Sequence, residues 1–371
     1  MKRDNKIEEL ALQRSKYKHL SDDEWRWLLQ QTEGRERTAD KLPTFADTDD
    51  WWYPVRLSCE QCSSELTAQY KASLVSGEKM VDLTAGYGVD TYFLSEHFMQ
   101  AYYVEQNAEL CRIAAHNFAL TGHQQSIIIH NMMAEDFLKT AGQYDLIFAD
   151  PARRDNYGGK VFKLDDCTPN IVELFPALLE HLTPKGRVML KLSPMLDISQ
   201  AVNALEAVQW DVHVVAVKNE VKEVLLVSDG TGLVTAIDLA KKDQVFTFTR
   251  EEEREVNVQY PMSSFQFIYE PNAAILKAGA YKLVAARYGL QKLDVNTHLY
   301  ASDKLVENFS GRVWKISNIQ SPISNANIVC RNYPFTPEQL KKKLKIKDGG
   351  DIYIIGCRVN GKPTLFTAER I

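Results

Sequence analysis

Two acidic residues and a glycine turn between them have the types and spacing to bind a nucleoside. Asp82 ends a short apolar stretch, Gly86 and Gly88 follow at once, and Glu105 ends the next apolar stretch, roughly 20 residues further on. Glycine tolerates positive φ and has no Cβ, so such a strand–turn–helix lets bare backbone approach a ligand. A carboxylate offers two acceptors, which match the two donors of a ribose diol.

The same glycine pair also fits any tight turn between a strand and a helix. Thr91 stands where a dinucleotide fingerprint would have its third glycine, so the pattern is not that fingerprint. The two flanking acids favour a binding site, because open α/β sheets bind ligands at the carboxyl ends of their strands.

A second candidate is the run Asp150-Pro151-Ala152-Arg153-Arg154, which follows the apolar stretch 145–149. In isolation it reads as a plain Asp-Pro turn. Beside the first strand, it would bring a further acid to the same crevice. The two arginines could bind a phosphate, or pair with Asp155 or Asp165.

Composition narrows the class of protein. The chain has 371 residues, enough for two or three domains, and a net charge of −5, so RNA or DNA binding would need a local basic surface. The polar start, 1–6, predicts no signal peptide, and no stretch predicts a membrane span, so we expect a cytoplasmic protein with reduced thiols. Cys59 and Cys62 lack a second matching pair, which favours packed thiols over a metal or redox site.

The elements that must position these residues alternate between strand and helix from residue 79 onward, which predicts a parallel sheet covered on both faces. The predicted strands are 80–83, 101–104, 127–130, 145–149 and 187–191, with helices starting near Asp90, Ala108, Ala134 and Asn170. A helix at 199–208 and two late strands, 211–217 and 223–228, complete this part.

The flanking regions carry weaker patterns. Residues 1–75 read as helical, with a capping box at Ser21–Glu24, a stop at Gly34, an irregular connection over 41–53 and a second helix over 57–74. After strands at 233–239 and 245–249 comes a solvated charge run, 250–254. We expect a helix at 275–288, strands at 312–316, 326–331, 351–357 and 364–367, and a helix at 337–345.

Asp82, the glycine turn and Glu105 together resemble the nucleoside pocket of class I S-adenosylmethionine-dependent methyltransferases. The resemblance implies S-adenosylmethionine as cofactor, with helices of the amino-terminal region over the cleft. It implies cofactor contacts from Lys71, Asp82, Thr84, Ala85, Gly86, Gly88, Glu105, Gln106, Met133 and Ala134. Met133 stands where such enzymes commonly carry an aspartate for the adenine amino group; Glu135 or Asp136 could substitute.

Asp150-Pro151 resembles the catalytic loop of base-modifying methyltransferases, which implies that Asp150, Pro151 and Arg153 line the acceptor. There the acid orients an amino group, and in-line positioning supplies most of the acceleration. Ala152 and Arg153 replace the usual proline and aromatic residue, which weakens the amino-group interpretation and leaves the target atom open. A nucleophilic cysteine is a separate possibility, with Cys167 as its candidate.

The last third, together with motifs earlier in the chain, resembles a family of bacterial class I methyltransferases with a ferredoxin-like piece and a THUMP-like domain, and this resemblance covers nearly the whole chain. The motifs are Ser63–Ala72, Tyr269–Asn272, Asn296–Asp303, Phe309–Arg312, Arg331–Phe335 and Gly349–Asp351. The resemblance implies four parts: a helical region (1–75), a Rossmann-like α/β methyltransferase domain (76–258), a ferredoxin-like piece (259–302) and a THUMP-like domain (303–371).

RNA is implied by the THUMP-like label and by a local basic run. The run carries one acid, Glu338, against six basic residues: Arg331, Lys341, Lys342, Lys343, Lys345 and Lys347. It suits a phosphate backbone, although a solvated helix face would look the same. We therefore expect a methyltransferase for a base in structured RNA (rRNA or tRNA). The alternatives are a small-molecule or protein methyltransferase, and a non-catalytic RNA-binding scaffold with a vestigial pocket.

Overall fold

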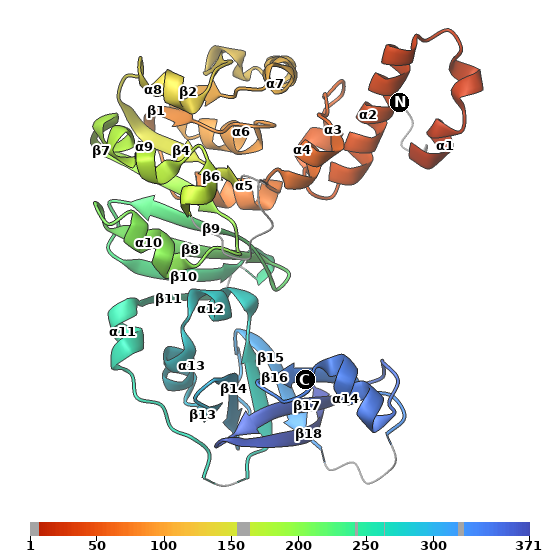
Figure 1. Ribbon diagram of the computed structural model, residues 1–371, viewed down its shortest axis with the longest axis vertical. Helices are drawn as coiled ribbons and strands as arrows, with labels where there is room; N and C mark the ends of the chain where they lie inside the picture. The colour runs from red at the N-terminus through yellow and green to blue at the C-terminus, as the bar shows by residue number, and fades with distance from the viewer. Residues whose placement is uncertain (1–6, 154–163, 242–243, 263, 318–322) are drawn as a thin grey trace. The chain divides into compact units, whose positions relative to one another are not determined.

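The computed structural model describes residues 7–153, 164–241, 244–262, 264–317 and 323–371 (Figure 1). The chain divides into two compact units. The first comprises residues 1–210 and 225–230, and the second comprises residues 211–224 and 231–371. The four predicted domain limits stay predictions.

A parallel sheet forms the centre of the first unit. Its strands are β1 (Gly77–Asp82), β2 (Phe98–Val104), β3 (Ile127–His130), β4 (Tyr144–Ala149) and β7 (Leu182–Leu192). They lie in the order β3-β2-β1-β4-β7, and every neighbouring pair is parallel. Met80, Leu146 and Met189 in the middle of the sheet are fully buried. The predicted doubly wound sheet is confirmed.

The predicted late strands also form, as β8 (Trp210–Val217) and β9 (Glu220–Ser228). Lys218 and Asn219 between them both have positive φ, as a tight hairpin turn requires. The full strand order is β11-β10-β8-β9-β7-β4-β1-β2-β3. The part from β8 to β3 is the arrangement that the resemblance to class I methyltransferases implied.

The helices between the strands begin where the sequence predicted. They are α6 (Val89–Ser95), α7 (Ala108–Leu120), α8 (Ala134–Leu138), α9 (Ile171–Glu180) and α10 (Ile198–Ala204). The last one ends four residues before its predicted limit. The indole of Trp210 donates to the carbonyl of Leu205 at 2.9 Å, so the chain turns into β8 at this point.

The amino-terminal region is helical, with α1 (Ile7–Ala11), α2 (Asp22–Thr38), α3 (Pro43–Asp47), α4 (Arg56–Gln61) and α5 (Glu65–Ala72). The capping box at Ser21 and Glu24 is confirmed. Gly34 does not end its helix, however. A Cβ there would lie 2.3 Å from the Cβ of Tyr53, so glycine serves close packing inside α2.

Two further expectations for this region are wrong. The stretch 41–53 contains the short helix α3, and the single helix predicted over 57–74 is two helices. Cys62 has an extended backbone, and Ser64 caps α5 by accepting from the backbone N–H of Thr67 at 3.2 Å. This break lets Cys62 and Ser63 line the cavity at the carboxyl ends of the parallel strands.

The second unit holds β8, parallel to β10 (Leu233–Asp238), which pairs with β11 (Val245–Thr249). A seven-stranded sheet has the order β13-β14-β12-β15-β18-β17-β16. Its strands are β12 (Phe267–Pro271), β13 (Gln291–Asp294), β14 (Thr297–Ser302), β15 (Gly311–Ile316), β16 (Asn327–Arg331), β17 (Ile352–Val359) and β18 (Lys362–Arg370). The predicted pieces 259–302 and 303–371 therefore share one sheet, packed around Trp314.

The helices of this unit are α11 (Arg250–Glu255), α12 (Ala273–Ala278), α13 (Tyr281–Tyr288) and α14 (Pro337–Leu344). The charge run 250–254 is thus a helix, and Glu253 accepts from the backbone N–H groups of Lys282 and Leu283 at the start of α13. The helix predicted over 275–288 is broken at Gly279, which has a φ of 84°.

Candidate active site

A cavity of about 320 Å³ lies at the carboxyl ends of the parallel strands in the first unit. It is lined by Ser58, Cys62 and Ser63 beside α4, by the turn from Asp82 to Asp90, and by residues that follow the other strands. These include Glu105, Gln106, Met133, Ala134, Glu135, Asp150, Ala152, Thr168, Pro169 and Lys191. The wall contains nearly all the predicted contacts: Asp82, Thr84, Ala85, Gly86, Gly88, Glu105, Gln106, Met133, Ala134 and Asp150.

The turn after β1 presents bare backbone, as predicted. Gly86 and Gly88 have φ values of 54° and 86°, a region that side chains disfavour. A Cβ at Gly88 would lie 3.0 Å from the ring of Phe118, so this glycine also allows close packing. The N–H of Ala85 donates to the carbonyl of Val104 at 3.0 Å, which ties the turn to β2.

Glu105 fixes this turn from the end of β2. One carboxylate oxygen accepts from the N–H of Gly86 at 3.0 Å, and the other accepts from the N–H of Asn107 at 2.8 Å. Each carboxylate oxygen can accept a second hydrogen bond. Glu105 can therefore hold the turn and still accept from a diol in the cavity.

Asp82 lies under the turn with only 1% of its surface exposed. It accepts from the N–H of Thr84 at 3.0 Å and from the hydroxyl of Thr91 at 2.7 Å. The pKa of Asp82 is raised to about 7, mainly by burial and also by the nearby Asp90 carboxylate, while the hydrogen bonds from Thr91 and Thr84 act to lower it. Thr91, which replaces the third glycine, thus holds an acid of the site.

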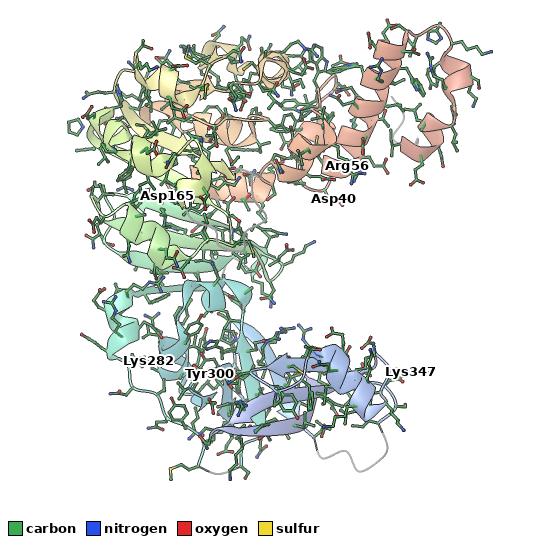
Figure 2. The ribbon with its side chains drawn as sticks, viewed as in Figure 1. Asp40, Arg56, Asp165, Lys282, Tyr300 and Lys347 are labelled. Carbon is green, nitrogen blue, oxygen red and sulfur yellow. The ribbon has the colours of Figure 1, made fainter. Side chains whose placement is uncertain are left out.

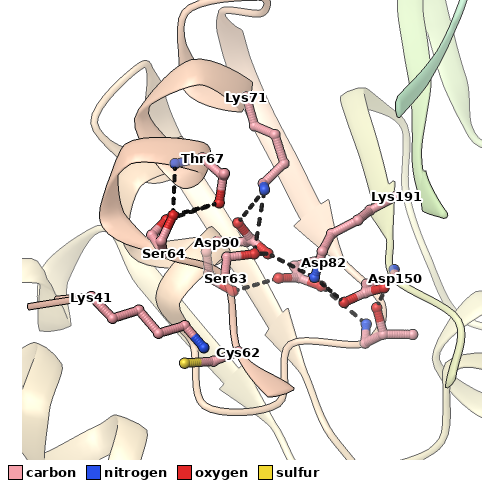
Figure 3. A network of polar contacts seen from close by, with 12 residues as sticks. Lys41, Cys62, Ser63, Ser64, Thr67, Lys71, Asp82, Asp90, Asp150 and Lys191 are labelled. Carbon is pink, nitrogen blue, oxygen red and sulfur yellow. Dashed lines mark hydrogen bonds and ion pairs between the residues drawn. The ribbon is translucent and has the colours of Figure 1, made fainter. Parts of the chain in front are cut away.

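Asp150 and Lys191 form an ion pair at the ends of β4 and β7 (Figure 3). The N–H of Asp150 donates to the hydroxyl of Thr84 at 2.6 Å, which links this loop to the turn after β1. Sequence reasoning missed Lys191. The available signal was its place at the end of the fifth strand, next to the strand that ends at Asp150.

A second missed group lies behind this pair. Asp90 Oδ1 lies 3.2 Å from the Lys71 ammonium, and Asp90 Oδ2 accepts from the Ser63 hydroxyl at 2.6 Å and lies 3.9 Å from Lys191 Nζ. Burial disfavours the charged carboxylate, but Lys71 and Lys191 together lower the pKa of Asp90.

Lys71 does not lie where the sequence suggested. Its side chain is fully buried and is not part of the cavity wall; instead its ammonium contacts Asp90 and Ser63 (Figure 3). It therefore supports a lining residue and does not reach the cavity itself.

On the side of β1 opposite to Asp150 and Lys191, Met133 and Ala134, which follow β3, line the cavity. The Met133 side chain is 46% exposed and offers only a weak acceptor. Asn131 donates to the carbonyls of Glu105 and Gln106 at 2.9 and 3.0 Å, so it fixes the loop after β2.

The loop after Asp150 continues into β5 (Ala152–Arg153), which pairs with β6 (Cys167–Thr168). Ala152, Thr168 and Pro169 line the cavity, whereas Pro151 does not, and Cys167 is buried outside the wall. This placement gives Cys167 no access to a bound base. The Arg153 side chain and Arg154 lie outside the described residues.

The basic run is partly neutralised within the second unit. Arg331 and Arg312 share the one buried carboxylate of Glu270, and Lys341 pairs with Asp348, while the Arg331 side chain stays 42% exposed. Lys343 lies 4.4 Å over the ring of Phe335. Lys342, Lys345 and Lys347, the last labelled in Figure 2, are exposed in and just beyond α14.

Three other features bear on function in the part of the chain that the structure describes: the cysteine thiols, possible metal ligands and possible membrane spans. All six cysteines are free thiols, and burial raises the pKa of Cys59 to about 12. Within those ranges, no group of three His, Cys, Asp or Glu side chains is placed to hold a metal ion. None of their helices has the length and hydropathy of a membrane span.

Comparisons with known proteins agree with this architecture. Residues 267–309 match the ferredoxin-like domain family and residues 317–370 match the THUMP domain-like family. Two Mycobacterium tuberculosis proteins described as uncharacterized S-adenosylmethionine-dependent methyltransferases, from strains CDC 1551 and H37Rv, are each 23% identical over 90% of this chain and 92% of their own length.

A crystal structure from Porphyromonas gingivalis W83, assigned as a methyltransferase candidate, is 32% identical. It superposes with a TM-score of 0.83 over 95% of this chain and 92% of its own. With a sheet of class I order, a cavity at its strand ends and this match over nearly the whole chain, the protein belongs to a family of S-adenosylmethionine-dependent methyltransferases with ferredoxin-like and THUMP-like domains.

Proposed function

We propose that this protein methylates a base in structured RNA, rRNA or tRNA, with S-adenosylmethionine as the methyl donor and direct in-line transfer. The observation that carries the proposal is the pairing of two features in one chain. One is a cavity of about 320 Å³ walled by Asp82, the glycine turn and Glu105, and the other is a THUMP-like segment with exposed lysines.

The residues of the cavity fit the cofactor. Glu105 has acceptor capacity left for two ribose hydroxyls, and the bare turn at Gly86 admits the chain between nucleoside and amino acid. Asp82, buried at the other side of the turn, can pair with an ammonium group in its ionised form, which its pKa of about 7 makes available at neutral pH and above. Ala134 offers a backbone N–H, and the absence of an acid at Met133 leaves Glu135 as the acceptor for the adenine amino group.

The mechanism rests on positioning. S-adenosylmethionine supplies a methyl group on a positively charged sulfur, which needs no further activation. Asp150 at the end of β4 orients the acceptor and takes its proton, while Thr84 holds the Asp150 backbone in place. Ser58, Cys62 and Ser63 line the cavity and form the part of its wall that comes from the amino-terminal region. Orientation alone can supply roughly 7–11 kcal/mol of barrier reduction.

The RNA part of the proposal predicts a local electrostatic contact, because the whole chain is acidic. Neutralising Lys342, Lys345 and Lys347 to Gln should weaken binding of total tRNA and rRNA. It should also reduce the slope of log affinity against log salt by up to about three. The measurement is a filter-binding titration at several salt concentrations.

Lys304, Lys315 and Lys362 to Gln form the matched control, since these three lysines are also exposed in the second unit. That variant should bind RNA as the natural protein does. Equal affinity and slope for both triple variants would contradict the assignment of RNA to this surface. A natural protein that shows no salt-dependent RNA binding would favour a small-molecule or protein substrate.

A further inference from the structure

Lys191 places a cation beside Asp150 in the cavity, on the side that the proposed function gives to the methyl acceptor. Its Nζ contacts Asp150 Oδ2 and lies 3.9 Å from Asp90 Oδ2, and its side chain is only 12% exposed (Figure 3). It lines the cavity together with Asp150. Its charge is therefore poorly screened by water and acts within the site.

The position of the pair within the cavity follows from the strand order. Glu105 and Met133 follow β2 and β3 on one side of β1, whereas on the other side Asp150 follows β4 and Lys191 lies at the carboxyl end of β7. A nucleoside held at Glu105 leaves the Asp150–Lys191 side for the group that receives the methyl. The ammonium is held there from behind by Asp90, itself fixed by Ser63 and Lys71.

The sign of this charge discriminates between acceptors. An exocyclic amine gains positive charge as it takes the methyl, and a neighbouring ammonium opposes that change. A ring nitrogen beside a carbonyl, as in guanine or uracil, instead loses its proton to react, and its negative charge spreads onto the carbonyl oxygen. An ammonium aimed at that oxygen stabilises the transition state.

We propose, on the basis of the proposed function above, that Lys191 is a catalytic residue. It selects as methyl acceptor a neutral ring nitrogen that carries a hydrogen and lies beside a carbonyl. Asp150 accepts the ring N–H, and Lys191 donates to the carbonyl oxygen. The ring nitrogen forms its bond to the methyl carbon as the carbon–sulfur bond breaks, and that electron pair stays on sulfur. The ring proton passes to Asp150 and then to water, while Lys191 keeps its own protons.

The first test needs no acceptor. S-adenosylmethionine carries a positive charge on sulfur and S-adenosylhomocysteine does not, so the ratio of their dissociation constants reports the charge near the methyl group. Calorimetry on the full chain should show that Lys191→Met lowers the ratio Kd(S-adenosylmethionine)/Kd(S-adenosylhomocysteine). Asp150→Asn should raise it. Each shift should be roughly two- to thirty-fold, the effect of a unit charge within about 8 Å.

Two further variants serve as controls. Lys185→Met removes an exposed charge from the same strand and should leave the ratio unchanged, and Lys191→Arg keeps the charge and should stay near the natural value. A ratio unchanged in both Lys191→Met and Asp150→Asn would overturn the placement of the pair. An equal change in Lys185→Met would do the same, because the effect would then not come from the site.

The second test identifies the product. RNA from a strain lacking the protein is methylated in vitro with the natural protein, digested to nucleosides and analysed by mass spectrometry. Methyl on guanine N1 or uracil N3, lost in Lys191→Met, supports the proposal, whereas methyl on guanine N7, which carries no proton, overturns it. Methyl on an exocyclic amine, a ring carbon or a ribose overturns it. Absence of any RNA methylation would refute the proposed RNA substrate, and the dissociation-constant ratio would then decide separately whether Lys191 faces the transferred group.

Discussion

At the scale of single residues, Glu105 combines two tasks that are usually considered apart. Its carboxylate holds the N–H of Gly86 and the N–H of Asn107, and the same two oxygens are the acceptors that a ribose would use. If the cofactor binds as proposed, loss of the side chain would remove a ligand contact and would also loosen the turn that surrounds the ligand. The two effects act on the same binding constant.

Replacing Glu105 by Ala should weaken S-adenosylmethionine binding about 100-fold, the value of two hydrogen bonds to a charged group. Glu105→Gln should weaken it less, because one amide oxygen still accepts. Calorimetry measures both, and Glu109→Ala on the exposed face of α7 is the control. A Glu105→Ala protein that binds within about twofold of the natural one would show that this acid does not contact the ligand.

Asp82 gives the site a pH signature. Burial raises the pKa of Asp82 from 3.8 to about 7. Between about pH 4 and 7 the folded protein therefore keeps a proton that the unfolded chain has already released. The stability conferred by the protonated acid is therefore present at low pH and is lost as the pH rises towards 7.

Asp82→Asn lacks this titration. The free energy of unfolding of the variant, relative to that of the natural protein, should rise by about 2 kcal/mol between pH 5 and 7 and then level off. Urea denaturation across this range measures the difference. If that difference stays flat from pH 5 to 8, or moves against the variant, Asp82 is ionised throughout and its burial does not control it.

At the scale of elements, the amino-terminal helices depend on close contacts that their sequence pattern does not predict. Gly34 lies in the middle of α2, where alanine would ordinarily favour the helix by about 1 kcal/mol. Here a Cβ would meet the Cβ of Tyr53 at 2.3 Å. Packing therefore opposes propensity at this position.

Gly34→Ala should lower the free energy of unfolding by about 1–3 kcal/mol, since the segment at Tyr53 must move to admit the methyl group. Gly142→Ala, where a Cβ meets nothing within 4 Å, should be near neutral. Thermal denaturation of the two variants gives the comparison. A stabilised Gly34→Ala protein would mean that α2 is not held against Tyr53.

The sequence could predict the acids at the strand ends, because parallel strands bring their carboxyl ends to one edge and Asp82, Glu105 and Asp150 each follow an apolar stretch. It could not predict which polar residues meet across elements. Lys191 faces Asp150 only because β7 lies beside β4. The sequence did not predict the end of the helix at Cys62, because no Pro or Gly marks it. It also did not predict that buried Lys71 pairs with Asp90.

At the scale of the whole molecule, the chain has the cavity that we propose for methyl transfer in one unit and a THUMP-like segment in the other. Its net charge of −5 opposes general attraction to RNA, so recognition would depend on a few exposed lysines. Ion pairs reduce the charge of that surface only in part, because Lys341 pairs with Asp348, which lies just outside the basic run, and Arg331 shares the single carboxylate of Glu270 with Arg312.

The most direct test of the account is the transfer of a labelled methyl group from S-adenosylmethionine to RNA isolated from a strain that lacks this protein. The natural protein should label that RNA. Asp150→Ala should still bind the cofactor, because Asp150 lies on the acceptor side of β1, but should label the RNA at least about 100-fold more slowly. RNA that stays unlabelled while protein or small-molecule fractions take up the label, or undiminished transfer by Asp150→Ala, would contradict the account.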